Sequence, residues 1–148
     1  WADLFTEDVH YVEHYLGVMR GLETVRRWIV PLMEQFPAIY TPYRWHTVDV
    51  ARGRVIFAML NRRDHPGGQG FIDFDGLSII EYAGGGLWRY QEDYWAVPAG
   101  LAAAKTYAEA CARHDPEHPR RKTRKDWGGG PAWTIGAPFW PGAMDGAR

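Results

Sequence analysis

The sequence has too few cysteines for a disulfide, no apolar run long enough to span a membrane, and no excess of positive charge for binding nucleic acid. Cys111 is the only cysteine, so no disulfide can form within the chain, and a cytoplasmic location is expected. No apolar run reaches the roughly 20 residues that a membrane-spanning helix needs, and no signal peptide is visible. The formal net charge of −1 argues against a general nucleic-acid binder. We therefore expect neither a membrane nor a nucleic acid as a partner.

Side chains that bind metals are scattered instead of clustered. The 6 histidines lack the spacing of a zinc site. His114 and His118 are four residues apart, but Pro116 lies between them and breaks a helix. The glycines at 84–86 lack the lysine and the following helix of a phosphate-binding loop, so a hairpin turn is favoured. We expect no metal and no cofactor.

Aromatic side chains, by contrast, are abundant. The 148 residues include 8 Trp, and 15% of the chain is aromatic within a hydrophobic fraction of 46%. A chain of this length can bury a core within one domain. Aromatic residues fill cores, line pockets and form interfaces, so their number alone does not choose among these roles.

Apolar residues at helical spacing predict a helix over 22–36. Pro31 lies inside this pattern and must kink or split the helix, because proline lacks a backbone donor. Upstream, residues 3–8 are predicted to form a short helix or turn, and residues 9–14 a strand, which a glycine turn follows. Downstream, a proline opens a second predicted helix over 98–113.

Between the two helices the pattern changes to strands separated by glycine-rich turns. The four β-rich runs are 43–51, 54–62, 70–83 and 87–97. Their short links predict an antiparallel meander. Gly76 within the third run predicts a bulge or sharp bend that curves the sheet. Helices combined with long curved strands indicate an α+β fold, in which a cone-shaped sheet wraps around helices.

The last part of the chain differs in composition. Residues 113–126 are rich in Lys and Arg, and residues 127–148 are rich in Gly, Pro and Trp without periodicity. We interpret residues 1–112 as one domain and residues 113–148 as an irregular tail. The Trp residues of the tail have the size to dock on the domain or on a partner.

Four segments of the chain together form a family pattern. They are Leu4-Phe5-Thr6-Glu7-Asp8-Val9, Gly21 with the helix that contains Trp28-Ile29, Gly76-Leu77-Ser78-Ile79-Ile80-Glu81-Tyr82, and Leu87-Trp88 with Glu92-Asp93-Tyr94-Trp95. This pattern resembles nuclear-transport-factor-2-like domains of the SnoaL-like branch, a superfamily that includes ketosteroid isomerases, polyketide cyclases, scytalone dehydratases and limonene-epoxide hydrolases. The resemblance covers residues 1–97 and implies a cone-shaped α+β fold with an apolar pocket. The family has one more helix before the position of Trp1, so we expect a helix upstream of this chain.

The resemblance implies that acidic residues carry out the chemistry inside the cone. Glu13 takes the place of the Asp that acts as general base in ketosteroid isomerases, and burial raises the pKa of such a carboxyl group. Asp93 is the implied second acid, because the polyketide cyclases place an acid/base group in the same cone. Tyr11 is the expected hydrogen-bond donor. His14 is a further catalytic candidate if a bulge turns it inward.

Each assignment has a structural alternative. Glu13 can be a buried carboxylate held by Tyr or Arg, and Asp93 can pair with Arg44 or Arg89 to fix the sheet. If Asp93 points inward, it faces Glu13. Two nearby carboxylates do not both ionise cheaply, so one of them would then hold a proton near neutral pH. His14 is a lone histidine, a type that is more often structural than catalytic.

The chain matches the limonene-epoxide hydrolase pattern in its first and last strands but not in the strand between them. Tyr11 and the run Asp93-Tyr94-Trp95 match that pattern, whereas Glu13 stands where the family has Asn. The Arg-x-Asp pair that binds and protonates the epoxide oxygen is replaced by Met59 and Asn61. Neither side chain can do this, so the resemblance disfavours epoxide hydrolysis by that mechanism.

Two hypotheses follow from the sequence. The first is a small-molecule enzyme of isomerase, cyclase or dehydratase type that acts on an apolar ligand in the cone without a cofactor. The second is a ligand-binding or dimerisation module without catalysis. The expected pocket wall consists of Trp28, Trp45, Phe57, Met59, Asn61, Phe74 and Trp95. Aromatic residues on the opposite face of the last strand are expected to form a homodimer interface through the sheet.

Overall fold

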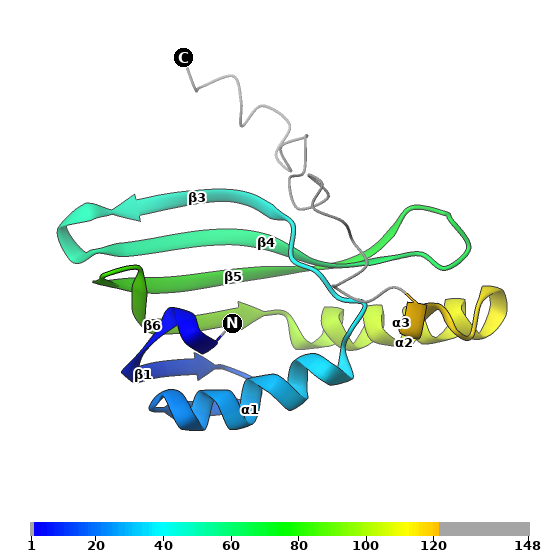
Figure 1. Cartoon of the computed structure of the whole chain (residues 1–148). Coiled ribbons are helices and arrows are strands. Elements are labelled where there is room, and N and C mark those ends of the chain that lie inside the picture. Colours follow the sequence, from blue (N-terminus) through cyan, green and yellow to red (C-terminus); the bar gives the residue numbers. More distant parts are fainter. Residues whose placement is uncertain (1, 122–148) are drawn as a thin grey trace, which may run out of the picture.

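The computed structural model of the chain describes residues 2–121 (Figure 1). Strands and helices combine in an α+β arrangement, as the sequence predicts. The elements in chain order are β1 (Phe5–Glu13), β2 (Gly17–Arg20), α1 (Leu22–Gln35), β3 (Tyr43–Asp49), β4 (Arg54–Asp64), β5 (Phe71–Gly84), β6 (Leu87–Trp95), α2 (Val97–His114) and α3 (His118–Arg121), with short 3-10 turns at Ala2–Leu4 and Val50–Arg52.

The strands of the described residues form a 6-stranded sheet in the order β2-β1-β6-β5-β4-β3. The predicted meander is confirmed, because β3, β4, β5 and β6 pair as antiparallel neighbours in sequence order. β1 instead pairs parallel to β6, with Tyr11 opposite Gln91 and Glu13 opposite Asp93. This pairing joins the strands that come first and last along the chain, and no local sequence pattern indicates it.

Both long helices cover the same face of the sheet (Figure 1). α1 packs on β1 through Val25 and Ile29, and α2 packs through Ala103 and Tyr107 on Ile72 of β5. We call this side the helix face and the opposite side the outer face. Side chains alternate along a strand, and the register therefore places the following on the helix face: Tyr11, Glu13, Phe57, Met59, Asn61, Phe74, Ser78, Gln91, Asp93 and Trp95.

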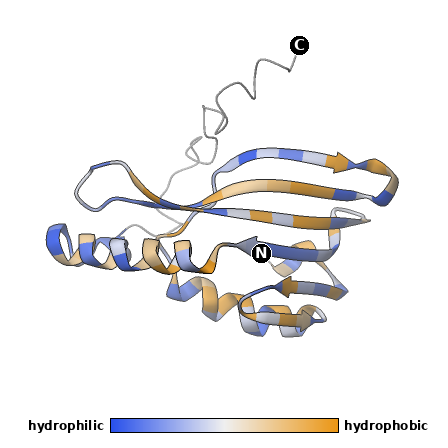
Figure 2. Ribbon diagram, turned by 180° about the vertical axis from the view of Figure 1, so that it is seen from behind, coloured by the Kyte–Doolittle hydropathy of each residue, from blue (hydrophilic) through white to orange (hydrophobic). Residues whose placement is uncertain are grey.

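The strand β4 is apolar on both of its faces. Residues 55–60 are all hydrophobic and appear as a continuous stretch of orange tones in Figure 2. Such runs are typical of strands that are covered on both sides. Ala58 and Leu60, which point to the outer face, are buried as well, so β4 contributes to packing on both sides of the sheet.

The start of the chain differs from the prediction. Residues 5–8, predicted as part of a short helix or turn, belong to β1, and the helical turn is confined to Ala2–Leu4. Residues 17–20, which the sequence indicated only as a glycine turn, form β2 antiparallel to β1. Phe5 and Val9 are buried in the same cluster as α1. This long-range burial overrides the weak local preference for a helix.

Gly76 does not form the predicted bulge. Its pairing is regular on both sides, with Met59 on β4 and Trp95 on β6. The irregular pairing of β5 with β6 lies nearer the hairpin, around Tyr82. Gly76 instead permits a close approach, because a methyl group there would lie 2.7 Å from the amide nitrogen of Asn61.

The helices keep their predicted positions with small differences. α1 continues through the exposed Pro31, so the proline does not split the helix. α2 begins one residue earlier and ends one residue later than predicted, and α3 follows it. No helix within residues 2–121 is long and apolar enough to cross a membrane. The domain boundary after residue 112 stays a prediction, and the predicted Trp-rich tail lies outside the described residues.

Gly100 permits the close packing of α2 on the sheet. It is buried, and a methyl group added there would lie 2.7 Å from Cε3 of Trp95 and 3.4 Å from Cε2 of Phe74. The first of these contacts is closer than carbon atoms tolerate, so the indole of Trp95 occupies the space that a side chain at position 100 would need.

We expect Gly100→Ala to destabilise the protein by about 1–3 kcal/mol, because the added methyl group overpacks the contact with Trp95. In a Trp95→Leu background the same change should be neutral or stabilising, since Ala favours a helix over Gly by about 1 kcal/mol. Urea unfolding of the single and double variants measures both effects. A stabilising effect of Gly100→Ala in the wild type would contradict this packing.

Candidate functional site

A polar cluster lies on the helix face where β1 meets β6. The parallel register sets Tyr11 beside Gln91 and Glu13 beside Asp93. The antiparallel register of β5 with β6 adds Ser78 opposite Asp93. The two carboxyl groups therefore become neighbours because two strands that are distant in sequence pair with each other.

Asp93 lies at the centre of this cluster. The Tyr11 hydroxyl donates a hydrogen bond to Asp93 Oδ2, and the Ser78 hydroxyl donates to Oδ1 at 2.5 Å. The amide nitrogen of Gln91 lies 3.0 Å from Oδ1, 3.1 Å from Oδ2 and 2.9 Å from the Tyr11 oxygen. Tyr11, Ser78 and Gln91 are 3%, 0% and 8% exposed, so buried donors surround a single carboxyl group.

Burial raises the pKa of Asp93 above its usual value. Hydrogen bonds from Ser78, Tyr11 and Gln91 act in the opposite direction, and the negative charge of Glu13 adds to the increase. The pKa of Tyr11 is also raised, first by burial and then by the charge of Asp93, so Tyr11 remains a neutral donor. This environment favours a proton on Asp93.

Glu13 is 5% exposed and interacts with a different set of groups. The indole N–H of Trp95 donates a hydrogen bond to Oε1. The backbone N–H groups of Tyr15 and Leu16 donate to Oε2 at 2.9 and 2.5 Å. The two backbone bonds close the turn between β1 and β2, so Glu13 supports the local fold beside Asp93.

The two carboxyl groups therefore differ in what they can do. All of the partners of Glu13 are N–H donors. Tyr11 and Ser78 contact Asp93 through hydroxyl groups, which accept as well as donate. The cluster can thus accommodate Asp93 with or without its proton, as a group that transfers protons requires. Within the described part of the chain, no group of three or more His, Cys, Asp or Glu side chains is placed to hold a metal ion.

Apolar side chains flank the polar cluster on the helix face. Trp28 of α1 packs edge-on against Tyr11, with ring centres 5.1 Å apart. Phe74 packs against Trp95 with ring centres 5.5 Å apart. The remaining predicted wall residues on this face belong to β4: Phe57, Met59 and Asn61. The structure therefore brings most of the predicted wall to the side of the sheet that carries Asp93.

Trp45 does not lie with the other predicted wall residues. Its partner on β4 is Ala58, on the outer face, and 37% of its surface is exposed. The pairing of β3 with β4 shifts by one residue between Tyr43 and Trp45. Such a shift turns a side chain to the opposite face of a sheet, so the pattern of the strand alone misplaces Trp45.

His14 also lies apart from the polar cluster. Its Nε2 is 2.7 Å from Oε1 of Glu92, and its ring stacks on Tyr94 with centres 4.2 Å apart. The hydroxyls of Tyr90 and Tyr94 donate to Glu92 at 2.7 and 2.6 Å. Burial alone would raise the pKa of Glu92, but hydrogen bonds from Tyr94, Tyr90 and His14 lower it to about 2. His14 therefore belongs to a hydrogen-bonded cluster around Glu92 on the outer face.

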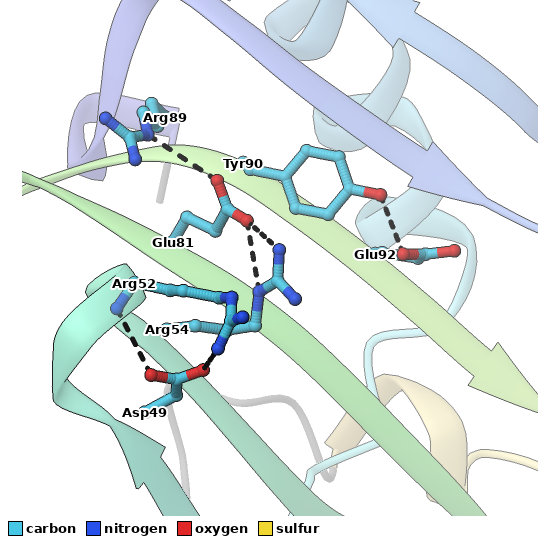
Figure 3. A network of polar contacts seen from close by, with 7 residues as sticks. All are labelled: Asp49, Arg52, Arg54, Glu81, Arg89, Tyr90 and Glu92. Carbon is cyan, nitrogen blue, oxygen red and sulfur yellow. Dashed lines mark hydrogen bonds and ion pairs between the residues drawn. The ribbon is translucent and has the colours of Figure 1, made fainter.

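A row of charged side chains crosses the outer face beside Glu92 (Figure 3). In this row Arg89 Nε lies 3.5 Å from Oε2 of Glu81. Arg44 donates a hydrogen bond to Asp75. Neither arginine hydrogen-bonds to Asp93, so Asp93 does not form the ion pair that the structural alternative requires.

Ser78 and Gln91 are members of the cluster that the sequence analysis did not identify. Neither is titratable, so a search for acids and bases passes over them. The alternation of side chains along a strand could have indicated both residues. Ser78 interrupts an apolar run, and Gln91 lies two residues before Asp93 and therefore on the same face of its strand. A polar side chain on a buried face needs a partner, and here Asp93 is the shared partner.

Solved structures with the same arrangement of sheet and helices define the fold class. An LEH-like epoxide hydrolase from M. tuberculosis superposes with a TM-score of 0.59 at 13% identity, covering 76% of this chain and 80% of its own. A Catenulispora acidiphila protein with a ketosteroid isomerase-like fold, in complex with trimethylamine, gives 0.58 at 17% identity, covering 70% and 78%. A Jannaschia protein described as a SnoaL-like polyketide cyclase gives 0.54 at 19% identity, covering 70% and 74%. The chain has the nuclear-transport-factor-2-like fold.

No family model and no curated protein sequence matches the chain. The expectation about the fold is confirmed by the solved structures. Their low identities establish the fold alone, and one fold of this kind hosts many reactions. Which reaction this chain could catalyse therefore depends on the side chains of the polar cluster.

Glu13→Gln is expected to destabilise the fold by about 1–3 kcal/mol. The amide places an NH₂ group where the Trp95 indole or the backbone N–H groups of Tyr15 and Leu16 now find an acceptor, and a buried donor without a partner costs this much. Urea unfolding measures the change, with Glu7→Gln on the exposed side of β1 as the matched control. Equal effects of the two substitutions would contradict a structural role for Glu13.

Asp93→Asn is expected to alter stability in a pH-dependent way. Because the folded-state pKa of Asp93 is raised above 3.8, the folded protein holds a proton that the unfolded chain releases. The stabilisation is present below the unfolded value and is lost as the pH rises through the folded pKa. Asn has no such proton, so the stability of the variant relative to the wild type should increase with pH. Each unit by which the pKa is raised corresponds to about 1.4 kcal/mol.

Urea unfolding at several pH values from about 4 to about 8 measures this difference. Asp8→Asn, which removes an exposed carboxylate from β1, is the matched control for the loss of one charge. A relative stability of Asp93→Asn that decreases with pH would show that the folded state favours the charged form of Asp93.

Proposed function

We propose that this protein is a small-molecule enzyme that performs acid/base chemistry without a cofactor, of the isomerase, cyclase or dehydratase type. The observation that carries the proposal is the buried hydrogen bond between Tyr11 and Asp93, whose pKa burial raises. A carboxyl group that keeps its proton, next to a neutral tyrosine, can stabilise negative charge on a ligand oxygen. Glu13, its neighbour on β1, supplies a second carboxyl group.

In the proposed reaction, the Tyr11 hydroxyl turns its single O–H from Asp93 to a carbonyl oxygen of the ligand, and the protonated Asp93 donates to the same oxygen. Glu13 accepts a proton from the adjacent carbon. The C–H bond breaks, its electron pair forms a carbon–carbon double bond, and the carbonyl π electrons move onto the oxygen. In a ligand with a carbon–carbon double bond β,γ to the carbonyl, the proton of Glu13 returns to the γ carbon. The double bond then moves into conjugation, the carbonyl group is regenerated and an isomer results. Glu13 Oε1 accepts a hydrogen bond from Trp95 and keeps a lone pair for this step.

The residues around the cluster support an apolar ligand. Trp28 packs on Tyr11, and Trp95, which packs on Phe74, donates a hydrogen bond to Glu13. A site with apolar walls and few convergent polar groups is typical for small molecules. Proteins of the same fold bind small molecules, one of them in complex with trimethylamine and another co-crystallised with polyporic acid. The ligand would lie on the helix face beside Asp93.

A different observation supports a second function. Glu13 already accepts hydrogen bonds from Trp95 and from the turn after β1, which favours a ligand-binding or dimerisation module in which both acids are structural. In this alternative a second copy of the chain would pair with the outer face. Trp45 and Tyr94 support that surface, since they are 37% and 40% exposed there.

Thermal unfolding of the full chain with a ligand panel separates the two functions. The panel contains ketosteroids, aromatic polyketides, terpenoids and epoxides, and a compound that binds only the folded state raises the melting temperature. Each compound is tested on the wild type, Asp93→Asn and Tyr11→Phe, with Asp8→Asn as the control. The enzyme proposal predicts a compound that loses about tenfold in affinity in the first two variants and nothing in the control.

That compound is then incubated with the protein, and product formation is followed by NMR. Turnover that falls by about 10²–10³-fold in Asp93→Asn would support stabilisation of the ligand oxygen by the hydrogen bond from Asp93. Binding that is equal in every variant, without turnover, would contradict the enzyme and favour the binding module.

A further inference from the structure

Three buried polar side chains between β4, α2 and α3 have atoms without hydrogen-bond partners. They are Arg63, Tyr107 and His118, which are 5%, 8% and 8% exposed. Arg63 Nη1, the Tyr107 hydroxyl and His118 Nε2 have no hydrogen-bond partner within the described part of the chain. Buried polar atoms are nearly always paired, so this set of atoms points to a partner that binds from outside.

The three side chains form one cluster around the ring of Tyr107. The guanidinium carbon of Arg63 lies 5.2 Å from the centre of that ring, and the centre of the His118 ring lies 6.2 Å from it. α3, which carries His118, lies beside α2 (Figure 1). The apolar surroundings are Ala38, Ile72, Ala103, Ala110 and Cys111. The polar atoms are therefore enclosed by groups that cannot accept their hydrogen bonds strongly.

Arg63 carries a charge that no carboxylate of the described residues neutralises. The acid next to it in sequence, Asp64, accepts a hydrogen bond from Tyr40, and Asp73 on β5 pairs with Arg62. The ring of Tyr107 offers a cation–π attraction but no hydrogen-bond acceptor. Burial lowers the pKa of Arg63, yet arginine stays protonated in proteins.

The other two side chains also present a free polar atom. Nδ1 of His118 lies 3.4 Å from Asp115, which leaves Nε2 free to contact another group. The Tyr107 hydroxyl lies near the Cys111 thiol, but it makes no hydrogen bond of ordinary geometry, and a thiol is a weak partner. A ligand that offers several acceptor lone pairs would satisfy both atoms together with Arg63.

We propose that Arg63, Tyr107 and His118 form a binding site for a small monoanion of the carboxylate class. One guanidinium group balances one negative charge, and its planar fork matches the two oxygens of a carboxylate. The Tyr107 hydroxyl donates to a remaining lone pair, and the His118 imidazole donates through Nε2 in the form that carries a proton on that nitrogen. A phosphate dianion would leave a buried negative charge without compensation.

This anion site is separate from the polar cluster of Asp93. The residue of β4 in the same row as Asp93 and Ser78 is Phe57. Arg63 lies six residues further along the strand, or about 20 Å at the rise of a β-strand. A bound anion would therefore connect α2 and α3 to the sheet without depending on the proposed reaction.

Acetate is the probe that tests the site, added to the full chain in place of chloride at constant ionic strength. The melting temperature should rise with the logarithm of the acetate concentration above the Kd, which isothermal titration measures directly. Arg63→Met keeps a similar length without the charge and should lower acetate affinity by about 10–100-fold. Without acetate this variant should melt at or above the wild-type temperature, because it removes an unpaired buried charge.

Arg113→Met is the matched control, since it removes an exposed charge from the same helix as Tyr107 and should keep the wild-type response. Tyr107→Phe should lower acetate affinity by about 2–10-fold through loss of one neutral hydrogen bond. If Arg63→Met does not fold, Arg63→Lys replaces it and should bind acetate about tenfold more weakly while it retains the charge.

The proposal is overturned if acetate leaves the wild type unchanged, or if Arg63→Met responds to acetate as the wild type does. Inorganic phosphate is measured under the same conditions. A larger response to phosphate than to acetate would overturn the assignment to carboxylates.

Discussion

The parallel pairing of β1 with β6 is the constraint on which the rest of the structure depends. It places Tyr11 and Glu13, from the start of the chain, beside Gln91 and Asp93 from the last strand. The register is held by side chains such as Val9, which is fully buried in the cluster under α1. A slip of one residue would turn Tyr11 and Glu13 to the outer face. The candidate site therefore exists only because a distant pairing is fixed by the core.

The same pairing places two carboxyl groups side by side, and the side chains that surround each of them differ. Glu13 is held by N–H donors from Trp95 and from the turn after β1. Asp93 is surrounded by hydroxyl groups and an amide, and burial together with the charge of Glu13 raises its pKa. One acid is thus fixed as an acceptor and the other tends to keep its proton. A buried carboxyl group with a raised pKa beside a second acid is a recurring arrangement in acid/base enzymes.

Features that depend on local physics could be predicted from the sequence. Apolar spacing located α1, glycine-rich turns separated β3 to β6, and alternation along β6 placed Asp93 and Trp95 on one face. The resemblance to a known family indicated Tyr11 and Glu13 as site residues, and the structure places both next to Asp93. The fold was therefore largely predictable, as was the carboxyl pair.

Features that depend on long-range pairing could not be predicted in this way. β2 and the first half of β1 are strands because they pair and pack, not because of their local sequence. Trp45 faces outward because of a one-residue shift in β3, and no spacing rule locates such a shift. Ser78 and Gln91 became recognisable as partners of Asp93 only once the register of β5 and β6 was known.

The protonation state of Asp93 tests the account most directly. Carbon-13 labelling of the aspartate carboxyl groups, with the Asp93 signal assigned from Asp93→Asn, allows its pKa to be measured by NMR titration of the full chain. We predict that the pKa of this carboxyl group lies above its usual value of 3.8, so that it titrates only at higher pH. Titration at or below that value would contradict this role, because Asp93 would then be a structural carboxylate with no proton to donate to a ligand oxygen.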